Sequence, residues 1–352
     1  MPVSRSILLL ALLACAMSPR AAHATEVPSA QALATMIELM ERRALYREEV
    51  DWTVVRAEIA KAAGNAERTR SLLDAAIQRS SRGHGRWLPA AGSTVPGPLP
   101  PAATVGEEAD AGQARLGMPL TLDARLGWVT VGRFTSTAGS TFEQARAAAM
   151  HAAGLQQRIR DADRSPRCGW IVDLRGNTGG NMWPMLLGTE PLLRIPGDGI
   201  QVVGMTRAAG APVPWELHDG TVMAKGRPML GFGQSGYRLR EPGAPVAVLL
   251  GPRTGSSGEA TALAFRGRPD SRSFGRPTAG YATSNSSIRL PDGSLFLLTD
   301  AVLADRNGQG DGSRIVPDDI TADDAATLAA ASHWLLSHRA CVEQTRATAR
   351  AR

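Results

Sequence analysis

Two adjacent serines, Ser256 and Ser257, stand between a predicted strand and a predicted helix, where a hydroxyl can act as a nucleophile. The small apolar residues 244–250 predict a buried strand, and residues 258–260 open an Ala- and Leu-rich helix. Backbone N–H groups at the start of that helix can stabilise an oxyanion. The pattern is therefore compatible with acyl-transfer chemistry, although many ordinary turns also contain Ser and Gly. The alternative is that both serines simply cap the helix.

A second segment, residues 169–180 (GWIVDLRGNTGG), reads as a hydrophobic strand followed by a glycine-rich loop. A strand with DLRGNxGG, followed later by a strand with T-x-SSGE and a helix, resembles the S41 peptidases. This family contains the C-terminal (tail-specific) processing proteases and the tricorn-like proteases. Residues 127–134 look like its first core strand and residues 305–320 like its closing loop. The resemblance covers nearly all of the mature chain and implies a ClpP/crotonase-like α/β core.

The resemblance assigns roles to the two motifs. The family nucleophile lies three residues before the glutamate of S-x-x-E, which makes Ser256 the expected nucleophile and Ser257 its competitor. The family oxyanion hole carries over to the N–H groups of Ser257 and Gly179. Gly180 is the substitute donor and an expected substrate contact, because glycine lets a backbone approach the substrate closely. Asp173 and Arg175 are expected to hold the loop through charge-assisted hydrogen bonds.

A serine nucleophile needs a base. Processing proteases supply a lysine in G-x-x-T-x-G-K, but the matching residues 275–281 end in Tyr281. A phenol with a pKa of about 10 is a poor base at neutral pH, so we expect Tyr281 to contact substrate rather than to replace the lysine. The two lysines of the chain, Lys61 and Lys225, fall in a predicted helical segment and a β-rich loop.

The tricorn-like branch uses a histidine where its helical segment ends, and His84 matches that position. Its flanking glycines leave the ring free to approach a neighbouring domain, and an imidazole suits proton transfer near neutral pH. Activity should then fall as the pH drops through the imidazole pKa, about 6.5 if unperturbed. The alternative is a surface-loop histidine without a catalytic role.

The same branch carries a glutamate in the closing loop, several residues before Pro-Asp. The matching residue is Asp311, whose carboxylate would orient the histidine and hold the imidazolium. An ordinary turn residue between two glycines is an equally good interpretation. Arg314 also stands where the family has a glycine, so the register of the match can slip here. Both interpretations stay open.

The N-terminal part divides into three predicted segments. Residues 1–24 have a positive n-region, an apolar h-region and an Ala-His-Ala cleavage site, as in a secretory signal peptide. A rival interpretation is a lipoprotein box ending at Cys15. Helical periodicity within residues 30–82 predicts a helical domain over residues 25–89. The Pro-, Gly- and Ala-rich residues 90–118 predict a linker, with no PDZ-like insert recognisable.

Strands alternating with helices predict an α/β catalytic domain over residues 119–325. A helix is expected at residues 140–160, between the first two core strands. Residues 183–242 are interrupted by Gly and Pro and are interpreted as β-rich. Residues 326–352 are expected to form a C-terminal helix and tail.

The cysteines and charges narrow the possible functions. Cleavage of the signal would leave Cys168 and Cys341, which an oxidising compartment allows to pair; simple burial of Cys168 is the favoured prediction. The net charge of +6 falls to about +4 with the signal removed, and scattered arginines with few aromatics argue against nucleic-acid binding. No later segment is apolar for long enough to cross a membrane. No metal or organic cofactor is implied.

The combined prediction is a periplasmic or secreted serine peptidase that acts on peptides or proteins, with Ser256 as nucleophile, His84 as base and Asp311 as a candidate orienting acid. Two alternatives stay open. One is a binding protein for a hydrophobic ligand or peptide, as in the retinoid-binding relatives that reuse this fold. The other is an esterase-like or degenerate hydrolase, because the family lysine is replaced by Tyr281.

Overall fold

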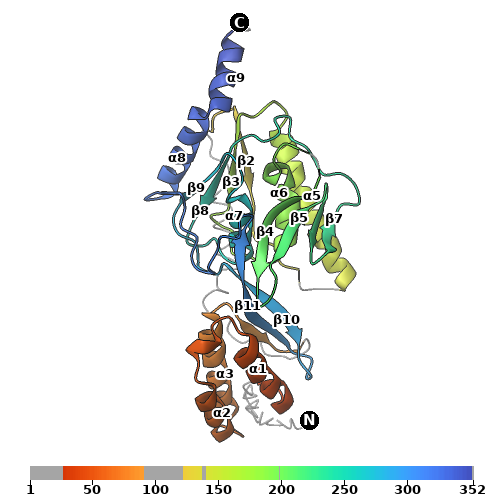
Figure 1. Cartoon of the computed structure of the whole chain (residues 1–352), viewed down its shortest axis with the longest axis vertical. Helices are drawn as coiled ribbons and strands as arrows, with labels where there is room; N and C mark the ends of the chain where they lie inside the picture. The colour runs from red at the N-terminus through yellow and green to blue at the C-terminus, as the bar shows by residue number, and fades with distance from the viewer. Residues whose placement is uncertain (1–26, 91–121, 137–139, 198, 351–352) are drawn as a thin grey trace, which may run out of the picture.

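The structure is a computed structural model that describes residues 27–90, 122–136, 140–197 and 199–350 (Figure 1). The predicted signal peptide, Cys15 and nearly all of the predicted linker lie outside these ranges. The described part contains a parallel sheet, an antiparallel sheet and helices packed on them, with the N-terminal and the C-terminal helices at opposite ends of the molecule.

The parallel sheet has the strand order β12-β9-β8-β3-β2. Its strands are β2 (Leu126–Thr130), β3 (Gly169–Asp173), β8 (Val246–Leu250), β9 (Ser271–Gly275) and β12 (Asp319–Ile320). Every residue of β3 and β8 is buried, as expected for parallel strands covered on both faces. The two strands are direct neighbours, so the loops that follow their carboxyl ends meet at one edge of the sheet.

Helices cover both faces of this sheet. On one face α5 (Thr141–Ala162), α6 (Met182–Leu193) and α7 (Ser257–Phe265) enclose a core that includes Trp170 of β3. On the other face α8 (Asp324–Ser337) packs Leu335 against a second core that includes the next residue of β3, Ile171. The alternation of side chains along β3 thus serves both layers.

The antiparallel sheet is organised around one long strand, β11 (Leu295–Asp305), which pairs with three others. It lies against β10 (Thr283–Arg289) along its length, against β1 (Arg86–Leu88) near its start and against β4 (Gln201–Arg207) near its end. The sheet continues through β5 (Val213–Leu217), β6 (Thr221–Ala224) and β7 (Arg227–Gly231). The β10–β11 hairpin therefore links the core to the N-terminal helices (Figure 1).

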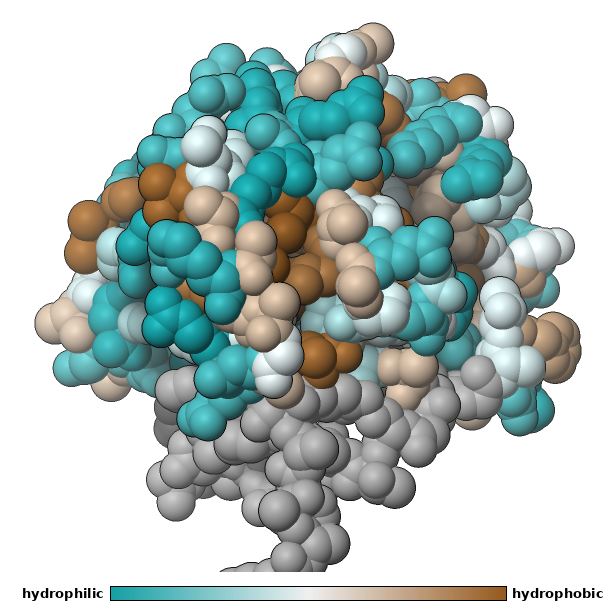
Figure 2. Space-filling view, turned by 90° about the horizontal axis from the view of Figure 1, so that it is seen from below, coloured by the Kyte–Doolittle hydropathy of each residue, from teal (hydrophilic) through white to brown (hydrophobic). Residues whose placement is uncertain are grey.

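The N-terminal helices are α1 (Ala30–Arg43), α2 (Trp52–Lys61) and α3 (Ala66–Ser81), with a short 3-10 turn, η1 (Arg47–Glu49). The helical spacing seen in the sequence is a buried face: Ile37, Met40 and Ala44 are at most 4% exposed. They share one hydrophobic cluster with Phe296 and Leu298 of the hairpin. The helical segment is therefore anchored on the hairpin. Seen from this end of the molecule, hydrophilic residues cover most of the surface, and hydrophobic ones lie in a furrow near its centre (Figure 2).

A disulfide joins Cys168, just before β3, to Cys341 in the last helix, α9 (Arg339–Arg350). Both cysteines are buried. The expectation that Cys168 is merely buried was therefore wrong, because its partner comes from a helix 173 residues further on. The bond fixes the C-terminal helices to the parallel sheet.

The interpretation of residues 183–242 as β-rich missed a helix. Strands β4 to β7 do occupy most of this range, but α6 covers its beginning. Every residue of α6 from Pro184 onward is buried, and Pro191 lies inside it. A helix buried on all sides shows no 3.6-residue alternation of polar and apolar residues, so its signal resembles that of an apolar strand.

Candidate active site

The strand-turn-helix around the two serines forms at the carboxyl edge of the parallel sheet, where β8 ends and α7 begins. Ser256 has φ 52° and ψ −115°, a backbone conformation that non-glycine residues rarely adopt. Such strain persists only where the surroundings hold it, and it gathers at functional sites. The turn therefore needs anchors on both sides.

The main anchor is the buried carboxylate of Glu259, three residues into the motif. It accepts hydrogen bonds from the N–H groups of Ser256 (2.8 Å), Tyr281 (2.8 Å) and Gly280 (3.0 Å). The Thr278 hydroxyl donates a fourth, at 2.5 Å. Burial raises the pKa of Glu259, while these four bonds oppose that shift. One side chain thus fastens the serine turn to the segment where the family carries its lysine.

His84 comes from a different part of the chain. Helix α3 ends at Ser81, and a left-handed turn through Arg82 (φ 49°) and Gly83 (φ 85°) directs the following residue back toward the core. The His84 Nε2 lies 2.9 Å from the Ser256 Oγ, although the two residues are 172 positions apart. Burial lowers the pKa of His84 to about 4, with a smaller contribution from the positive charge of Arg86.

The other ring nitrogen of this histidine meets a hydroxyl. His84 Nδ1 lies 2.6 Å from the Thr283 Oγ1, at the first residue of β10. The His84 backbone is also tied to this strand, because the Asn285 side-chain amide donates to the His84 carbonyl (3.0 Å). The sequence did not predict Thr283, because a carboxylate was the expected partner of the histidine and this threonine belongs to no motif.

The predicted acid, Asp311, does not contact the histidine. Its carboxylate accepts hydrogen bonds from the N–H (2.9 Å) and the hydroxyl (2.6 Å) of Ser313, which lower its pKa. The neighbouring Gly312 does reach the site: a Cβ there would lie 2.9 Å from the Thr283 Cγ2. The closing loop therefore approaches the histidine's partner with its backbone, and Asp311 behaves as a turn residue.

The competitor serine is engaged elsewhere. The Ser257 hydroxyl donates to the Gly180 carbonyl at 2.7 Å, which ties the helix to the glycine-rich loop. Its own N–H is the first of α7 and has no partner within the helix. Of the two hydroxyls, only that of Ser256 hydrogen-bonds the histidine.

The glycine-rich loop lies directly against the serine turn. A Cβ on Gly179 would come within 2.9 Å of the Ser256 Cβ, so only glycine fits there. The Gly179 N–H, however, donates to the Asn177 side chain (2.9 Å) and is not free to bind an oxyanion. At Gly180 the φ is +118°, and its N–H has no hydrogen-bond partner within the described ranges. Gly180 is thus better placed than Gly179 to donate.

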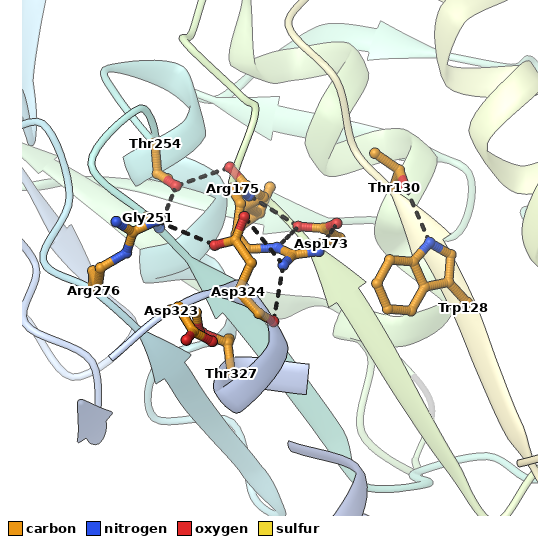
Figure 3. Close-up of polar contacts among 11 residues, drawn as sticks. Trp128, Thr130, Asp173, Arg175, Gly251, Thr254, Arg276, Asp323, Asp324 and Thr327 are labelled. Atoms are coloured by element: carbon orange, nitrogen blue, oxygen red, sulfur yellow. Dashed lines mark hydrogen bonds and ion pairs between the residues drawn. The ribbon is translucent and has the colours of Figure 1, made fainter. Parts of the chain in front are cut away.

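An ion-pair network supports the glycine-rich loop on the side of helix α8 (Figure 3). Arg175 makes two hydrogen bonds to the Asp173 carboxylate, at 2.9 and 2.8 Å, with both side chains buried. It also approaches Asp324 at the start of α8, which Arg276 contacts at 3.2 Å. Thr254 ties the serine loop to the same place by donating to the Leu174 carbonyl (2.8 Å). These groups shape both loops and do not touch the serine–histidine pair.

Tyr281 stacks near the histidine. The two ring centroids lie 5.2 Å apart with the planes tilted by 30°. The two lysines lie elsewhere: Lys61 pairs with Glu58 on the exposed face of α2, and Lys225 lies in the turn between β6 and β7. Of these side chains, His84 is the one with a nitrogen within hydrogen-bond distance of the Ser256 Oγ.

Two further observations concern metal binding and membrane spanning. Within the residues that the structure describes, no three His, Cys, Asp or Glu side chains gather as metal ligands would. In the same part of the chain, no helix combines the length and apolar character needed to cross a bilayer.

Comparison with known proteins agrees with the family resemblance seen in the sequence. Residues 125–321 match the model of peptidase family S41. The nisin-resistance protein of Lactococcus lactis subsp. lactis is 36% identical over 169 residues, which are 48% of this chain. The match spans 50% of that relative, so half of its length has no counterpart in the alignment.

Two solved structures share the fold. A lipoprotein from Streptococcus agalactiae superposes with a TM-score of 0.63 at 23% identity, over 89% of this chain and 98% of that one. A protein from Parabacteroides merdae gives 0.56 at 18% identity, over 87% and 96%. The family match covers more than half of the 352 residues, including the loop at 173–180 and the turn at Ser256. The chain therefore belongs to peptidase family S41.

Proposed function

We propose that this chain is a secreted serine peptidase that hydrolyses peptide bonds through an acyl-enzyme on Ser256, with His84 as the general base. The observation that carries the proposal is the 2.9 Å contact between His84 Nε2 and Ser256 Oγ, on a strained turn at the mouth of a sheet. A nucleophile within hydrogen-bond reach of a base, itself oriented by a third group, is the general arrangement for covalent catalysis.

The proposed reaction runs in two halves. His84 Nε2 takes the proton from Ser256 Oγ as that oxygen attacks the scissile carbonyl carbon. The tetrahedral intermediate collapses, the imidazolium gives its proton to the leaving amine, and the acyl group stays on Ser256. Water then attacks the ester as His84 accepts its proton. The imidazolium returns that proton to the Ser256 Oγ as the acyl–oxygen bond breaks, and the free acid leaves.

The negative oxygen of each intermediate needs donors that are already in position. We assign this role to the N–H groups of Ser257 and Gly180. The first opens α7, and the second belongs to the residue whose carbonyl receives the Ser257 hydroxyl. Gly179 supplies close packing rather than a donor, because its N–H is already bonded to Asn177. Tyr281, beside the histidine ring, is a candidate substrate contact.

Two observations support export from the cytoplasm. Residues 1–24 have the pattern of a signal peptide. The Cys168–Cys341 disulfide is of a kind that persists in oxidising compartments such as the periplasm. A mature N-terminus at Thr25 is expected; a lipidated Cys15 as the first residue would instead indicate a surface lipoprotein.

The test is hydrolysis of a panel of unstructured peptides, with nisin included because of the relative's name. Ser256→Ala and His84→Ala should each lower kcat by about 10³-fold or more, and the double variant should be no worse, because base and nucleophile act as a unit. Ser337→Ala and His218→Ala are matched controls away from the site. Full activity of Ser256→Ala, or of His84→Ala, would reject the assignment of these residues. Absence of hydrolysis in every form, including the unmodified chain, would instead favour the binding-protein alternative.

A further inference from the structure

The third member of the candidate site is a neutral hydroxyl. Thr283 is 4% exposed, and its Oγ1 lies 2.6 Å from His84 Nδ1, the ring nitrogen that faces away from the serine. The contact is shorter than the 2.9 Å between the histidine and Ser256. A serine–histidine pair commonly has a carboxylate at this position. Here the matching loop carboxylate, Asp311, bonds Ser313 instead.

The chemistry fixes which atom carries the ring proton. To accept the Ser256 proton, His84 Nε2 must be unprotonated, so the neutral ring must carry its hydrogen on Nδ1. A group that accepts a hydrogen bond from Nδ1–H holds the ring in this tautomer. We propose that Thr283 is a positioning residue that accepts the Nδ1–H hydrogen bond and so keeps His84 ready to act as the base. This inference rests on the proposed function of the pair.

Thr283 is itself held in place from several sides. It is the first residue of β10 and pairs with Val302 of β11. The α-carbon of Gly312 packs so closely on the Thr283 methyl group that a Cβ would lie 2.9 Å from it. Two residues on, Asn285 donates to the His84 carbonyl and accepts from the Thr299 hydroxyl at 2.7 Å. The ring and the backbone of His84 are thus both tied to this hairpin.

A hydroxyl in this position differs from a carboxylate in one respect that can be measured. It orients the ring but adds no negative charge, so it does little to favour the imidazolium over the neutral ring. The positive charge of Arg86 acts in the opposite sense to a carboxylate. The site therefore keeps a base that resists protonation, and it forgoes ion-pair stabilisation of the imidazolium formed during the reaction.

Three substitutions separate orientation from charge. Thr283→Val keeps the shape and removes the acceptor; kcat should fall by about 10- to 100-fold, the range for one hydrogen bond to a charged group, with KM little changed. Thr283→Ser should retain activity within about 3-fold. Thr283→Asp should move the acid limb of the pH profile upward by about 1 to 3 pH units, because a carboxylate now faces the imidazolium. Thr206→Val is the control: it removes a strand hydroxyl that accepts a hydrogen bond from the Trp215 indole, and it should leave kcat and the acid limb of the pH profile unchanged.

A second readout does not depend on hydrolysis. ¹⁵N NMR of the His84 imidazole should show the Nδ1–H tautomer in the unmodified chain and in Thr283→Ser, and a shift toward Nε2–H in Thr283→Val. An Nε2–H tautomer in the unmodified chain would overturn the proposal, as would unchanged kcat and tautomer in Thr283→Val. If no substrate is cleaved while NMR gives the expected tautomers, the proposed peptidase function fails and the positioning role of Thr283 stands.

Discussion

The pH dependence of activity tests the environment of His84 most sharply. As the proposed base, His84 acts only when its ring is neutral, and burial together with Arg86 lowers its pKa to about 4. The sign follows directly: kcat/KM should stay on its plateau as the pH falls from 7 to 5, and should drop only near pH 4. An exposed histidine would instead lose activity through about pH 6.5.

The difference is large at an intermediate pH. At pH 5.5 a base with a pKa of about 4 is roughly 97% neutral, whereas one with a pKa of about 6.5 is roughly 9% neutral. The two cases therefore differ by about tenfold in kcat/KM relative to the plateau. The assay is kcat/KM for one fluorogenic peptide from pH 3.5 to 8, with circular dichroism at each pH to check that the chain remains folded.

The smaller of the two causes of the lowered His84 pKa, the charge of Arg86, can be tested by substitution. Arg86→Gln removes the positive charge, so the acid limb should move upward by a fraction of a pH unit. Arg289→Gln, on an exposed arginine at the far end of β10, should leave it in place. An acid limb near pH 6.5 in the unmodified folded chain would refute the burial argument.

Three further outcomes are expected. Gly180→Ala should abolish activity, because its Cβ would lie 1.9 Å from a backbone carbonyl oxygen, whereas Gly197→Ala, also at positive φ but in open space, should remain active; equal kcat values would contradict this. Asp311→Asn should keep kcat within about 3-fold, since within the described residues that carboxylate hydrogen-bonds Ser313 of its own turn. A loss of about 100-fold would restore it as the orienting acid. Replacing Cys168 and Cys341 by serine should lower the unfolding free energy by about 2 to 5 kcal/mol in thermal or denaturant melts, and an unchanged midpoint would show that the bond contributes nothing.

The parts of the fold that the sequence predicted well are those with a strong period or a strong motif. Residues 140–160 carry a Ser–Glu cap and form α5. The apolar run at 244–250 contains β8, and the helical positions Ile37 and Met40 are buried. Helix α6 escaped because it is apolar on every side and contains Pro191, so it has no alternation to detect.

The candidate site divides in the same way. Motif spacing pointed to Ser256 and His84, and the structure places them within hydrogen-bond distance. Motif spacing could not point to Thr283, because nothing about a single threonine at the start of a strand marks it as the partner of a histidine. Nor could it exclude Gly179 as a donor, since that depends on how the Asn177 side chain folds back within the loop. Such contacts are made by tertiary structure, and short-range sequence patterns do not encode them.

The most direct test of the central claim is to map the site of covalent modification by a fluorophosphonate probe. A serine activated by His84 should react rapidly, and peptide mass spectrometry should find the adduct on Ser256 alone. Ser256→Ala should not be labelled, and His84→Ala should be labelled far more slowly. An adduct on Ser257, or an unmodified chain after prolonged exposure to the probe, would contradict the account.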